Sequence, residues 1–364
     1  MNIIFIAGAR PNFMKIAPIL KALHEHNGNK KLITYKLVHT GQHFDYNMSE
    51  SFFEQLLIPR PDVNLECGGG TQAEQTAQIL VKFEEYLMQH PADLVVVVGD
   101  VTSTMACSIV AQKLNTKVAH VEGGIRSGDW SMPEEINRIV TDSISNYFFT
   151  TTKQAGNILL QSGKKPEQIF FVGNTMIDTL LSNQKRFIEP DFFEALHLKP
   201  QSYFVLTLHR PSNVDNPQKF NGYLETIDQT AENIPVIFPV HPRTRKILAN
   251  LNSERFKNIY FVDPQPYLQF NYLVKYSKGV ITDSGGITEE ATVFQIPCIT
   301  LRTTTERPET CEIGTNVLIG EDLQMLEKSI NDIIDGKWKK GNIPDLWDGK
   351  TAERIVDVLH TLSQ

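Results

Sequence analysis

The sequence is poor in cysteine and has no long apolar run. Its four cysteines form no C-x-x-C pair and no cluster with histidine, so they exclude a disulfide scaffold and show no zinc-ligand spacing. We expect all four to be free thiols of a reducing compartment: Cys67, Cys107, Cys298 and Cys311. No stretch approaches the roughly 20 apolar residues that span a bilayer. The N-terminal apolar run lacks a basic segment before it, which predicts a buried strand rather than a signal peptide, and hence a cytoplasmic protein.

An excess of positive charge is also missing. Lysine and arginine number 35 against 42 aspartates and glutamates, a net charge of −7. Such a balance does not attract nucleic acid or an anionic membrane, so we expect neither as a partner. An anionic ligand must instead be held by a local group of positive side chains. The apolar fraction of 41% is that of an ordinary globular protein.

Short β-branched runs alternate with helix-period segments along the chain. The runs are almost continuously apolar, which is typical of parallel strands covered by helices on both faces. A first series comprises residues 3–7, 32–39, 94–98, 118–121 and 148–150, and a second comprises 204–208, 236–240, 259–262, 279–282 and 298–301. The pattern predicts an α/β protein with two Rossmann-like, doubly wound domains and a ligand-binding cleft between them.

We place the domain boundaries by the change in composition around residues 173–201. The N-terminal domain is expected to cover residues 1–172 and the C-terminal domain residues 173–348. Residues 349–364 contain an amphipathic helix that can pack back on the N-terminal domain.

Charged residues follow several strands of the first series. Arg10 and Lys15 flank a glycine turn and a helix start, an arrangement that suits an anion. His43 follows the second strand. Three carboxylates, Asp100, Glu122 and Glu134, lie in successive segments after strands. If they converge, their mutual repulsion separates their pKa values, as acid/base chemistry requires. Each residue alone also has an ordinary structural explanation, such as a helix cap or a solvated loop.

The second series carries residues suited to a phosphate. His209 and His241 each follow a strand, and Ser284-Gly285-Gly286 opens a helix with backbone N–H groups that can approach an anion. Glu290 lies one turn into that helix. Arg307 lies in a charged loop after the last strand of the series.

Taken together, these motifs resemble the non-hydrolysing UDP-N-acetylglucosamine 2-epimerases from end to end. The matching segments run in the family's order: Gly8-Ala9-Arg10-Pro11, Thr40-Gly41-Gln42-His43, Gly99-Asp100, His120-Val121-Glu122-Gly123-Gly124, Pro133-Glu134-Glu135-Ile136-Asn137-Arg138, Asp283-Ser284-Gly285-Gly286 and Thr305-Glu306-Arg307-Pro308-Glu309. The resemblance implies the GT-B architecture, a homodimer, and interconversion of UDP-GlcNAc and UDP-ManNAc without metal or redox cofactor. The N-terminal domain is then expected to hold the sugar, and the C-terminal domain UDP.

The resemblance also implies a mechanism and residue roles. UDP leaves C1 as the C2 proton is removed, a 2-acetamidoglucal forms, and UDP adds back with protonation of the other face. Asp100, Glu122 and Glu134 are the expected acid/base groups. The remaining expected roles are as follows: phosphate binding by Arg10, His209, His241 and the amides of Ser284, Gly285 and Gly286; ribose binding by Glu290; uracil packing by Phe270; sugar placement by Lys15, His43, Arg138 and Arg307.

The chain departs from the family pattern at three places. His209-Arg210-Pro211-Ser212 replaces a more usual His-Arg-Arg-Glu, and Gly123 replaces alanine, which we expect to loosen the sugar pocket. The run Phe44-Asp45-Tyr46-Asn47-Met48 lacks the glutamine of members activated by UDP-GlcNAc, so we predict turnover without that activator. Alternatives are an epimerase of a modified UDP-sugar, a hydrolysing epimerase, a GT-B glycosyltransferase and, least favoured, a non-catalytic sensor.

Overall fold

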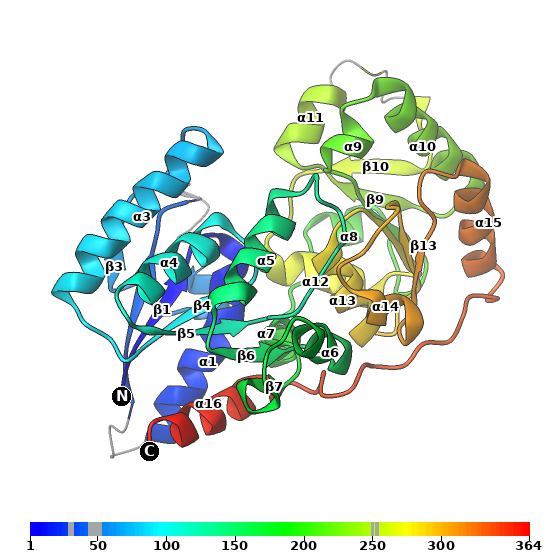
Figure 1. Ribbon diagram of the computed structural model, residues 1–364. Helices are drawn as coiled ribbons and strands as arrows, with labels where there is room; N and C mark the ends of the chain where they lie inside the picture. Colours follow the sequence, from blue (N-terminus) through cyan, green and yellow to red (C-terminus); the bar gives the residue numbers. More distant parts are fainter. Residues whose placement is uncertain (28–32, 43–52, 249–250, 252–254) are drawn as a thin grey trace. The chain divides into compact units, whose positions relative to one another are not determined.

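The structure is a computed structural model that describes residues 1–27, 33–42, 53–248, 251 and 255–364 (Figure 1). Its internal contacts divide the chain into two compact units. The first unit contains Met1–Ser182 and Asp345–Gln364, and the second contains Asn183–Pro344. The boundaries that we placed at residues 172 and 348 differ from this division, because residues 173–182 and 345–348 make their contacts within the first unit.

The first unit is built on a seven-stranded parallel sheet of order β3-β2-β1-β4-β5-β6-β7. Its strands are β1 (Asn2–Ala7), β2 (Thr34–His39), β3 (Val63–Asn64), β4 (Leu94–Val98), β5 (Lys117–Val121), β6 (Tyr147–Thr150) and β7 (Ile169–Phe171). The central strand β4 reads Leu-Val-Val-Val-Val and is buried throughout. β-branched side chains suit such a position because they pack well on a pleated surface.

The helices of the first unit include α1 (Arg10–Asn27), α3 (Gln72–Gln89), α4 (Thr102–Lys113), α5 (Pro133–Ile144), α6 (Lys153–Gln161), the 3₁₀ turn η1 (Pro166–Gln168), α7 (Thr175–Asn183) and α16 (Thr351–Leu362), and residues 53–56 are also helical. Helix α5 begins with Pro133, which suits a first helical position, followed by two glutamates that suit the N-terminal dipole. The C-terminal helix α16 packs against α1 (Figure 1).

The second unit repeats the same strand order on a six-stranded parallel sheet, β10-β9-β8-β11-β12-β13. Its strands are β8 (Phe204–Thr207), β9 (Val236–Pro239), β10 (Ile259–Val262), β11 (Gly279–Thr282), β12 (Cys298–Thr300) and β13 (Asn316–Leu318). Its described helices are η2 (Gln184–Arg186), α8 (Phe192–Ala195), α9 (Pro211–Val214), α10 (Pro217–Thr230), α11 (Pro242–Leu248), α12 (Tyr267–Tyr276), α13 (Gly285–Val293), α14 (Pro308–Glu312) and α15 (Leu323–Ile334).

Both faces of the second sheet are buried. Phe204 and Leu206 of β8 belong to one apolar cluster, whereas Tyr203 and Val205 belong to another. Alternate residues of a strand point to opposite faces, so this division places a core on each side of the sheet. Two covered faces explain why the strands read as continuous apolar runs.

The prediction of two parallel-sheet α/β domains is confirmed. The ten predicted strands are present, and their ends agree or differ by at most two residues; residue 32 lies outside the described residues. Three more strands went unpredicted, namely β3, β7 and β13. Each lies at a sheet edge and has only two or three residues, which is too short for an apolar run to stand out. Over the described residues, no helix is both long and apolar enough to cross a membrane.

Candidate active site

The strand order of each sheet reverses at one place, between β1 and β4 in the first unit and between β8 and β11 in the second. Ligands of such sheets bind beyond the carboxyl ends of the strands at this switch point. Arg10 and Asp100 follow β1 and β4, and His209 and Ser284 follow β8 and β11. These four predicted site residues thus lie at the switch point of their own sheet.

Asn12 shapes the loop between β1 and α1. Its side-chain oxygen accepts hydrogen bonds from the backbone N–H groups of Gly8 and Ala9, at 3.0 and 2.9 Å. Its amide nitrogen donates to the Val98 carbonyl at 2.9 Å and so joins this loop to the end of β4. Asn12 is not among the predicted site residues, because an asparagine near a helix start usually signals a cap.

Lys15 and Glu122 form a buried ion pair. Lys15 Nζ lies 2.7 Å from Glu122 Oε2, and the side chains are 12% and 4% exposed. Glu122 has a backbone φ of +72°, a left-handed conformation that is uncommon outside glycine and asparagine. Such strain persists only where surrounding contacts impose it, and it is frequent in active sites. A methyl group on Gly99 would approach Lys15 Nζ to 3.3 Å, so the glycine leaves room for the ammonium group.

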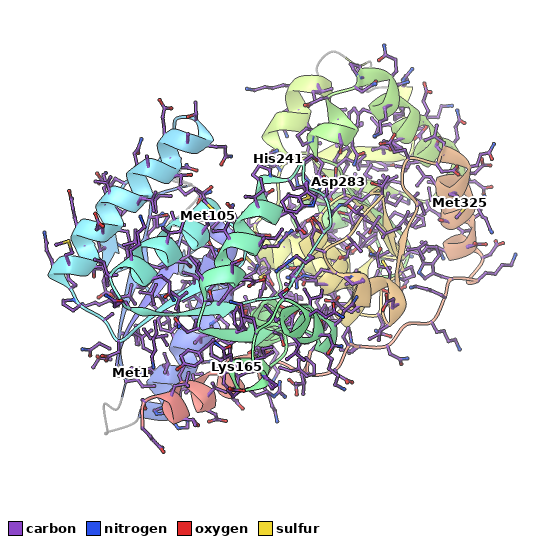
Figure 2. All side chains as sticks on the ribbon, in the orientation of Figure 1. Met1, Met105, Lys165, His241, Asp283 and Met325 are labelled. Carbon is purple, nitrogen blue, oxygen red and sulfur yellow. The ribbon has the colours of Figure 1, made fainter. Side chains whose placement is uncertain are left out.

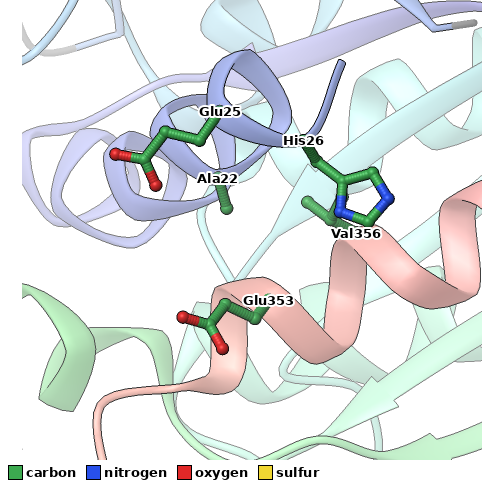
Figure 3. Close-up of a pocket in the computed structure, with 5 residues that line it drawn as sticks. All are labelled: Ala22, Glu25, His26, Glu353 and Val356. Carbon is green, nitrogen blue, oxygen red and sulfur yellow. The ribbon is translucent and has the colours of Figure 1, made fainter. Parts of the chain in front are cut away.

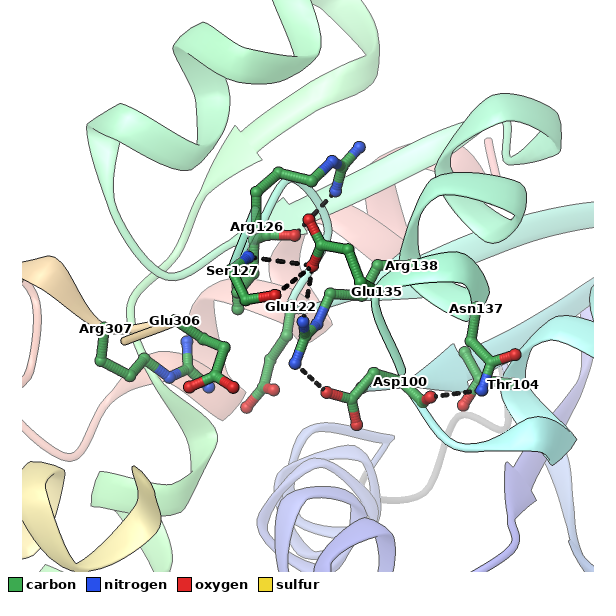
Figure 4. Close-up of polar contacts among 12 residues, drawn as sticks. Asp100, Thr104, Glu122, Arg126, Ser127, Glu135, Asn137, Arg138, Glu306 and Arg307 are labelled. Carbon is green, nitrogen blue, oxygen red and sulfur yellow. Dashed lines mark hydrogen bonds and ion pairs between the residues drawn. The ribbon is translucent and has the colours of Figure 1, made fainter. Parts of the chain in front are cut away.

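Asp100 is held by α5. Its carboxylate oxygen Oδ2 lies 2.5 Å from Nη2 of Arg138, and its carbonyl oxygen accepts a 2.9 Å hydrogen bond from Asn137 (Figure 4). The Asp100 side chain is 31% exposed, whereas that of Arg138 is 6% exposed. The carboxylate therefore keeps an open side while its orientation is set by a buried cation.

Glu135 fixes the other end of Arg138. The two side chains pair at 2.8 Å, and the Glu135 carboxylate also accepts hydrogen bonds from the backbone of Ser127 and Gly128, at 2.9 and 3.1 Å (Figure 4). Burial raises the pKa of Glu135, but the bonds from Ser127, Arg138 and Gly128 outweigh it, so the pKa lies below its ordinary value. The lowered pKa favours an ionised Glu135, and its pair with Arg138 keeps that side chain directed at Asp100.

The other predicted site residues of the first unit differ from one another in exposure, and one of them is not described. Arg10 is exposed on the first turn of α1, and Glu134 is half-buried on the first turn of α5. His43 and the run 44–48 lie outside the described residues. A methyl group on Gly123 would meet Phe148 and Asp142, at 3.0 and 3.3 Å. Gly123 is therefore packed closely against buried side chains, and the looser sugar pocket stays a prediction.

In the second unit, His209 is oriented by Asp283. His209 Nδ1 lies 2.9 Å from Asp283 Oδ1, and the backbone N–H groups of His209 and Arg210 donate to Oδ2 at 3.0 and 2.9 Å. Burial alone would raise the pKa of Asp283. The hydrogen bonds and charge of His209 outweigh this effect, so the pKa lies below its ordinary value. The His209 ring is 42% exposed and lies 5.9 Å from the His241 ring, so its other nitrogen can face a ligand. His241 and Asp283 are marked in Figure 2.

Ser284 precedes the first turn of α13, and Gly285 and Gly286 form its start. A methyl group on Gly286 would meet no atom within 4 Å, which leaves the backbone there accessible. Glu290 is buried in the same helix, 3.4 Å from the side-chain nitrogen of Asn271. Phe270 is half-buried and packs against the apolar core, so part of its ring has a structural role.

Arg307 is buried and paired with Glu289 of α13 at 2.6 Å. Arg302 and Glu306 form a bidentate pair with two contacts of 2.8 Å. Sequence reasoning omitted Arg302, Glu289 and Glu306 from the site, because a charged loop gives no sign of which charges will pair. Within the ranges that the structure covers, no group of three or more His, Cys, Asp or Glu side chains could hold a metal ion.

A separate hollow lies between α1 and α16 (Figure 3). It is lined by Ala22, Glu25, His26, Glu353 and Val356. These α1 residues are at the opposite end of the helix from Arg10, so the hollow is remote from the switch point of the sheet.

A pair of Rossmann-like units with charged side chains at their switch points is typical of nucleotide-binding α/β enzymes. The family model described as UDP-N-acetylglucosamine 2-epimerase matches residues 24–360. The chain is 42% identical to a UDP-N-acetylglucosamine 2-epimerase of Methanocaldococcus jannaschii, with 99% of each chain covered. It is 38% identical to the UDP-2,3-diacetamido-2,3-dideoxy-D-glucuronate 2-epimerase of Pseudomonas aeruginosa, with 100% of each covered.

A solved structure gives the same result. The Methanocaldococcus jannaschii enzyme in complex with UDP-GlcNAc and UDP matches with a TM-score of 0.87 and 41% identity, over 99% of this chain and 100% of that one. The chain belongs to the UDP-N-acetylglucosamine 2-epimerase family, whose members are isomerases acting on UDP-sugars. The family resemblance seen in the sequence is thereby confirmed.

Proposed function

We propose that this protein interconverts UDP-GlcNAc and UDP-ManNAc without releasing the sugar. The observation that carries the proposal is the pair of cation-held carboxylates at one switch point, Asp100 with Arg138 and Glu122 with Lys15. Epimerisation must serve two opposite faces of C2, which calls for more than one acid/base group. The activity for which the relatives are named and the solved complex of a relative with UDP-GlcNAc support the same substrate.

The proposed reaction begins with elimination. A carboxylate takes the C2 proton while the bond between C1 and the diphosphate oxygen breaks, and the electron pair leaves with UDP. A C1–C2 double bond remains in a 2-acetamidoglucal. In the reverse step on the other face, the diphosphate oxygen bonds to C1 and a carboxylic acid returns a proton to C2. Asp100, Glu122 and Glu134 are the proposed proton carriers.

The second unit is proposed to stabilise the departing diphosphate. The C2 proton is not acidic, because no carbonyl activates it, so departure of UDP must build positive character at C1. His209, with one nitrogen bound to Asp283, can donate from its other nitrogen to the phosphate. The departing diphosphate would also be bound by the amides at Ser284, Gly285 and Gly286 and by the charges of Arg10 and His241. Glu290, Phe270 and Arg307 are proposed to hold ribose, uracil and sugar.

Proton NMR in D₂O tests the proposal. Purified enzyme and UDP-GlcNAc, without added metal or NAD, should give a UDP-ManNAc anomeric signal with deuterium entering at C2. Free UDP together with free ManNAc would instead establish a hydrolysing enzyme. No change at all would refute both.

A second candidate is epimerisation of a modified UDP-sugar, favoured by the 38% identity to the diacetamido-glucuronate enzyme. Side-by-side kcat/KM values for UDP-GlcNAc and UDP-2,3-diacetamido-2,3-dideoxy-D-glucuronate separate the two. A tenfold or greater preference for the uronate would replace the first proposal.

We also propose that the enzyme is a cytoplasmic homodimer. All four cysteines are free thiols, which agrees with a reducing compartment. Sedimentation equilibrium should give twice the chain mass of 41.2 kDa. A monomer that epimerises at full rate would contradict the dimer.

A further inference from the structure

A buried charge cluster lies behind the carboxylates of the first unit. His120 of β5 contacts Asp142 of α5, with 2.7 Å between Nδ1 and Oδ1 and side-chain exposures of 1% and 3%. Arg126 joins the second carboxylate oxygen at 2.6 Å. These three residues belong to no part of the proposed proton-transfer or nucleotide-binding set.

Both ring nitrogens of His120 face oxygen atoms that accept hydrogen bonds. Nε2 lies 2.8 Å from the carbonyl oxygen of Gly99, which can only accept. Burial raises the pKa of Asp142, but the hydrogen bond and charge of His120 and the charge of Arg126 lower it to below its ordinary value. Independently of His120, Arg126 at 2.6 Å and the backbone N–H of Gly124 at 3.0 Å favour an ionised Asp142 carboxylate, which also accepts. Both contacts are satisfied together only if each ring nitrogen carries a hydrogen.

The cluster reaches the backbone beside each central carboxylate. Gly99 directly precedes Asp100, and the Asp142 carboxylate accepts a 3.0 Å hydrogen bond from the N–H of Gly124, two residues after Glu122. Gly124 has little freedom, because a methyl group there would lie 2.2 Å from the Ala155 carbonyl oxygen. The Asp142 carboxylate thus links the turn that carries Glu122 to the turn that carries Asp100.

Helix α5 contacts Asp100 at two points and reaches the preceding Gly99 through His120. Asn137 binds the Asp100 carbonyl, Arg138 binds its carboxylate, and Asp142 reaches Gly99 through His120. Arg138 and Asp142 are four residues apart and so lie on one face of α5. The link through His120 joins both α5 and β5 to Gly99, whose backbone N–H also donates to the Val121 carbonyl of β5 at 3.0 Å.

We propose that His120 is a positioning residue: as an imidazolium bound to Asp142, it holds the Gly99 turn and so sets the Asp100 carboxylate relative to Glu122. This inference rests on the proposed roles of Asp100 and Glu122. A displacement near 1 Å in an active site can reduce the rate about 100-fold, so a small shift of this turn is sufficient to matter.

Two substitutions distinguish an effect of the His120–Gly99 contact on catalysis from an effect on stability alone. His120→Asn can keep the contact to Asp142 through its amide nitrogen but cannot reach Gly99. We expect kcat to fall about 10- to 100-fold with the Kd for UDP unchanged. Asp142→Asn can donate to His120 Nδ1 and accept from Gly124 and Arg126, so it preserves the geometry, and we expect kcat within a few-fold of wild type.

Asn146→Ala is the matched control. Asn146 accepts a 2.8 Å hydrogen bond from Val118 N at the other end of β5. The control should lose stability while kcat stays unchanged. Wild-type kcat in His120→Asn, or an equal loss of kcat in the control, would overturn the proposal.

A measurement on the wild-type enzyme needs no substitution and no turnover. Nitrogen NMR of the His120 ring should show hydrogen on both nitrogens at neutral pH. A ring with a single hydrogen would overturn the ionic link. Absence of epimerisation by wild type would refute the proposed function alone, because the ring signal and the UDP affinity do not depend on catalysis.

Discussion

The two central carboxylates of the first unit are held in different ways. Glu122 is almost fully buried against Lys15, whereas the carboxylate of Asp100 is about one-third exposed beside Arg138. A proton carrier must exchange its proton during each turnover, and partial exposure makes this easier for Asp100. The buried ion pair of Glu122 instead depends on Lys15 to offset the cost of burial.

Neutralising the proposed proton carriers tests their role directly. Asp100→Asn, Glu122→Gln and Glu134→Gln should each lower kcat at least about 100-fold, the scale of general acid/base groups, while UDP still binds. Steady-state kinetics and calorimetry of UDP binding provide the two readings. Glu353→Gln, in the remote hollow on α16, is the control and should remain active. Near-normal turnover of any of the three variants would remove that residue from the catalytic set.

His209 offers a second test at single-residue resolution. In His209→Asn the amide nitrogen can still donate to Asp283, but the group that would face the diphosphate is lost. Removal of one such donor costs about 100- to 1,000-fold in kcat in other enzymes, and we expect a loss of that order. His24→Asn, on an exposed position of α1, is the control. Unchanged kcat in His209→Asn would exclude a role in stabilising the leaving group.

At the scale of elements, α16 is fastened to the first unit by Asp178 of α7. The carboxylate of Asp178 accepts hydrogen bonds from the backbone N–H groups of Thr351 and Ala352, at 3.2 and 2.7 Å. The Trp347 ring is buried just before this helix and donates to the Thr151 carbonyl at 3.3 Å. The end of the chain is thus part of the first unit.

This attachment predicts a pH dependence of stability. Burial raises the pKa of Asp178 to about 6, despite hydrogen bonds that lower it. The folded state therefore binds this proton more tightly than the unfolded chain does. The contribution is complete below about pH 4 and is lost as the pH rises through about 6, with a magnitude of at most about 3 kcal/mol.

Urea unfolding of wild type and Asp178→Asn at several pH values measures this contribution. The unfolding free energy of wild type minus that of the variant should decrease as the pH rises from about 4 to about 7. Asp345→Asn, which removes an exposed ion pair with Lys153, is the control and should show no such trend. A constant difference across the pH range would contradict the assignment to Asp178.

At the scale of the whole molecule, activation by UDP-GlcNAc can be tested with UDP-ManNAc as the sole substrate. The run 44–48 lacks the glutamine of activated family members, so pure UDP-ManNAc should be converted without a lag. Coupled assays with UDP-ManNAc freed of UDP-GlcNAc measure this. Turnover that starts only after a trace of UDP-GlcNAc is added would show that the activator site exists.

The cleft that we expect between the units remains a prediction. If UDP is bound by residues of both, its addition should draw the units together and lower the radius of gyration. Small-angle X-ray scattering with and without UDP gives this value. An unchanged scattering curve would count against closure.

Local sequence was sufficient to predict the doubly wound fold and to propose residues for the site. Parallel strands buried on both faces need continuous apolar runs, and their carboxyl ends carry the loops in which Asp100, Glu122, His209 and Ser284 lie. These features depend on neighbours along the chain, so they can be read without coordinates.

Only the tertiary structure decided which charges pair. Lys15 and Glu122 are 107 residues apart, and His209 and Asp283 are 74 apart. His120 and Asp142 also come from different elements. An ion pair forms where folding brings two side chains within a few ångströms, and no periodicity or propensity of the local chain encodes that meeting.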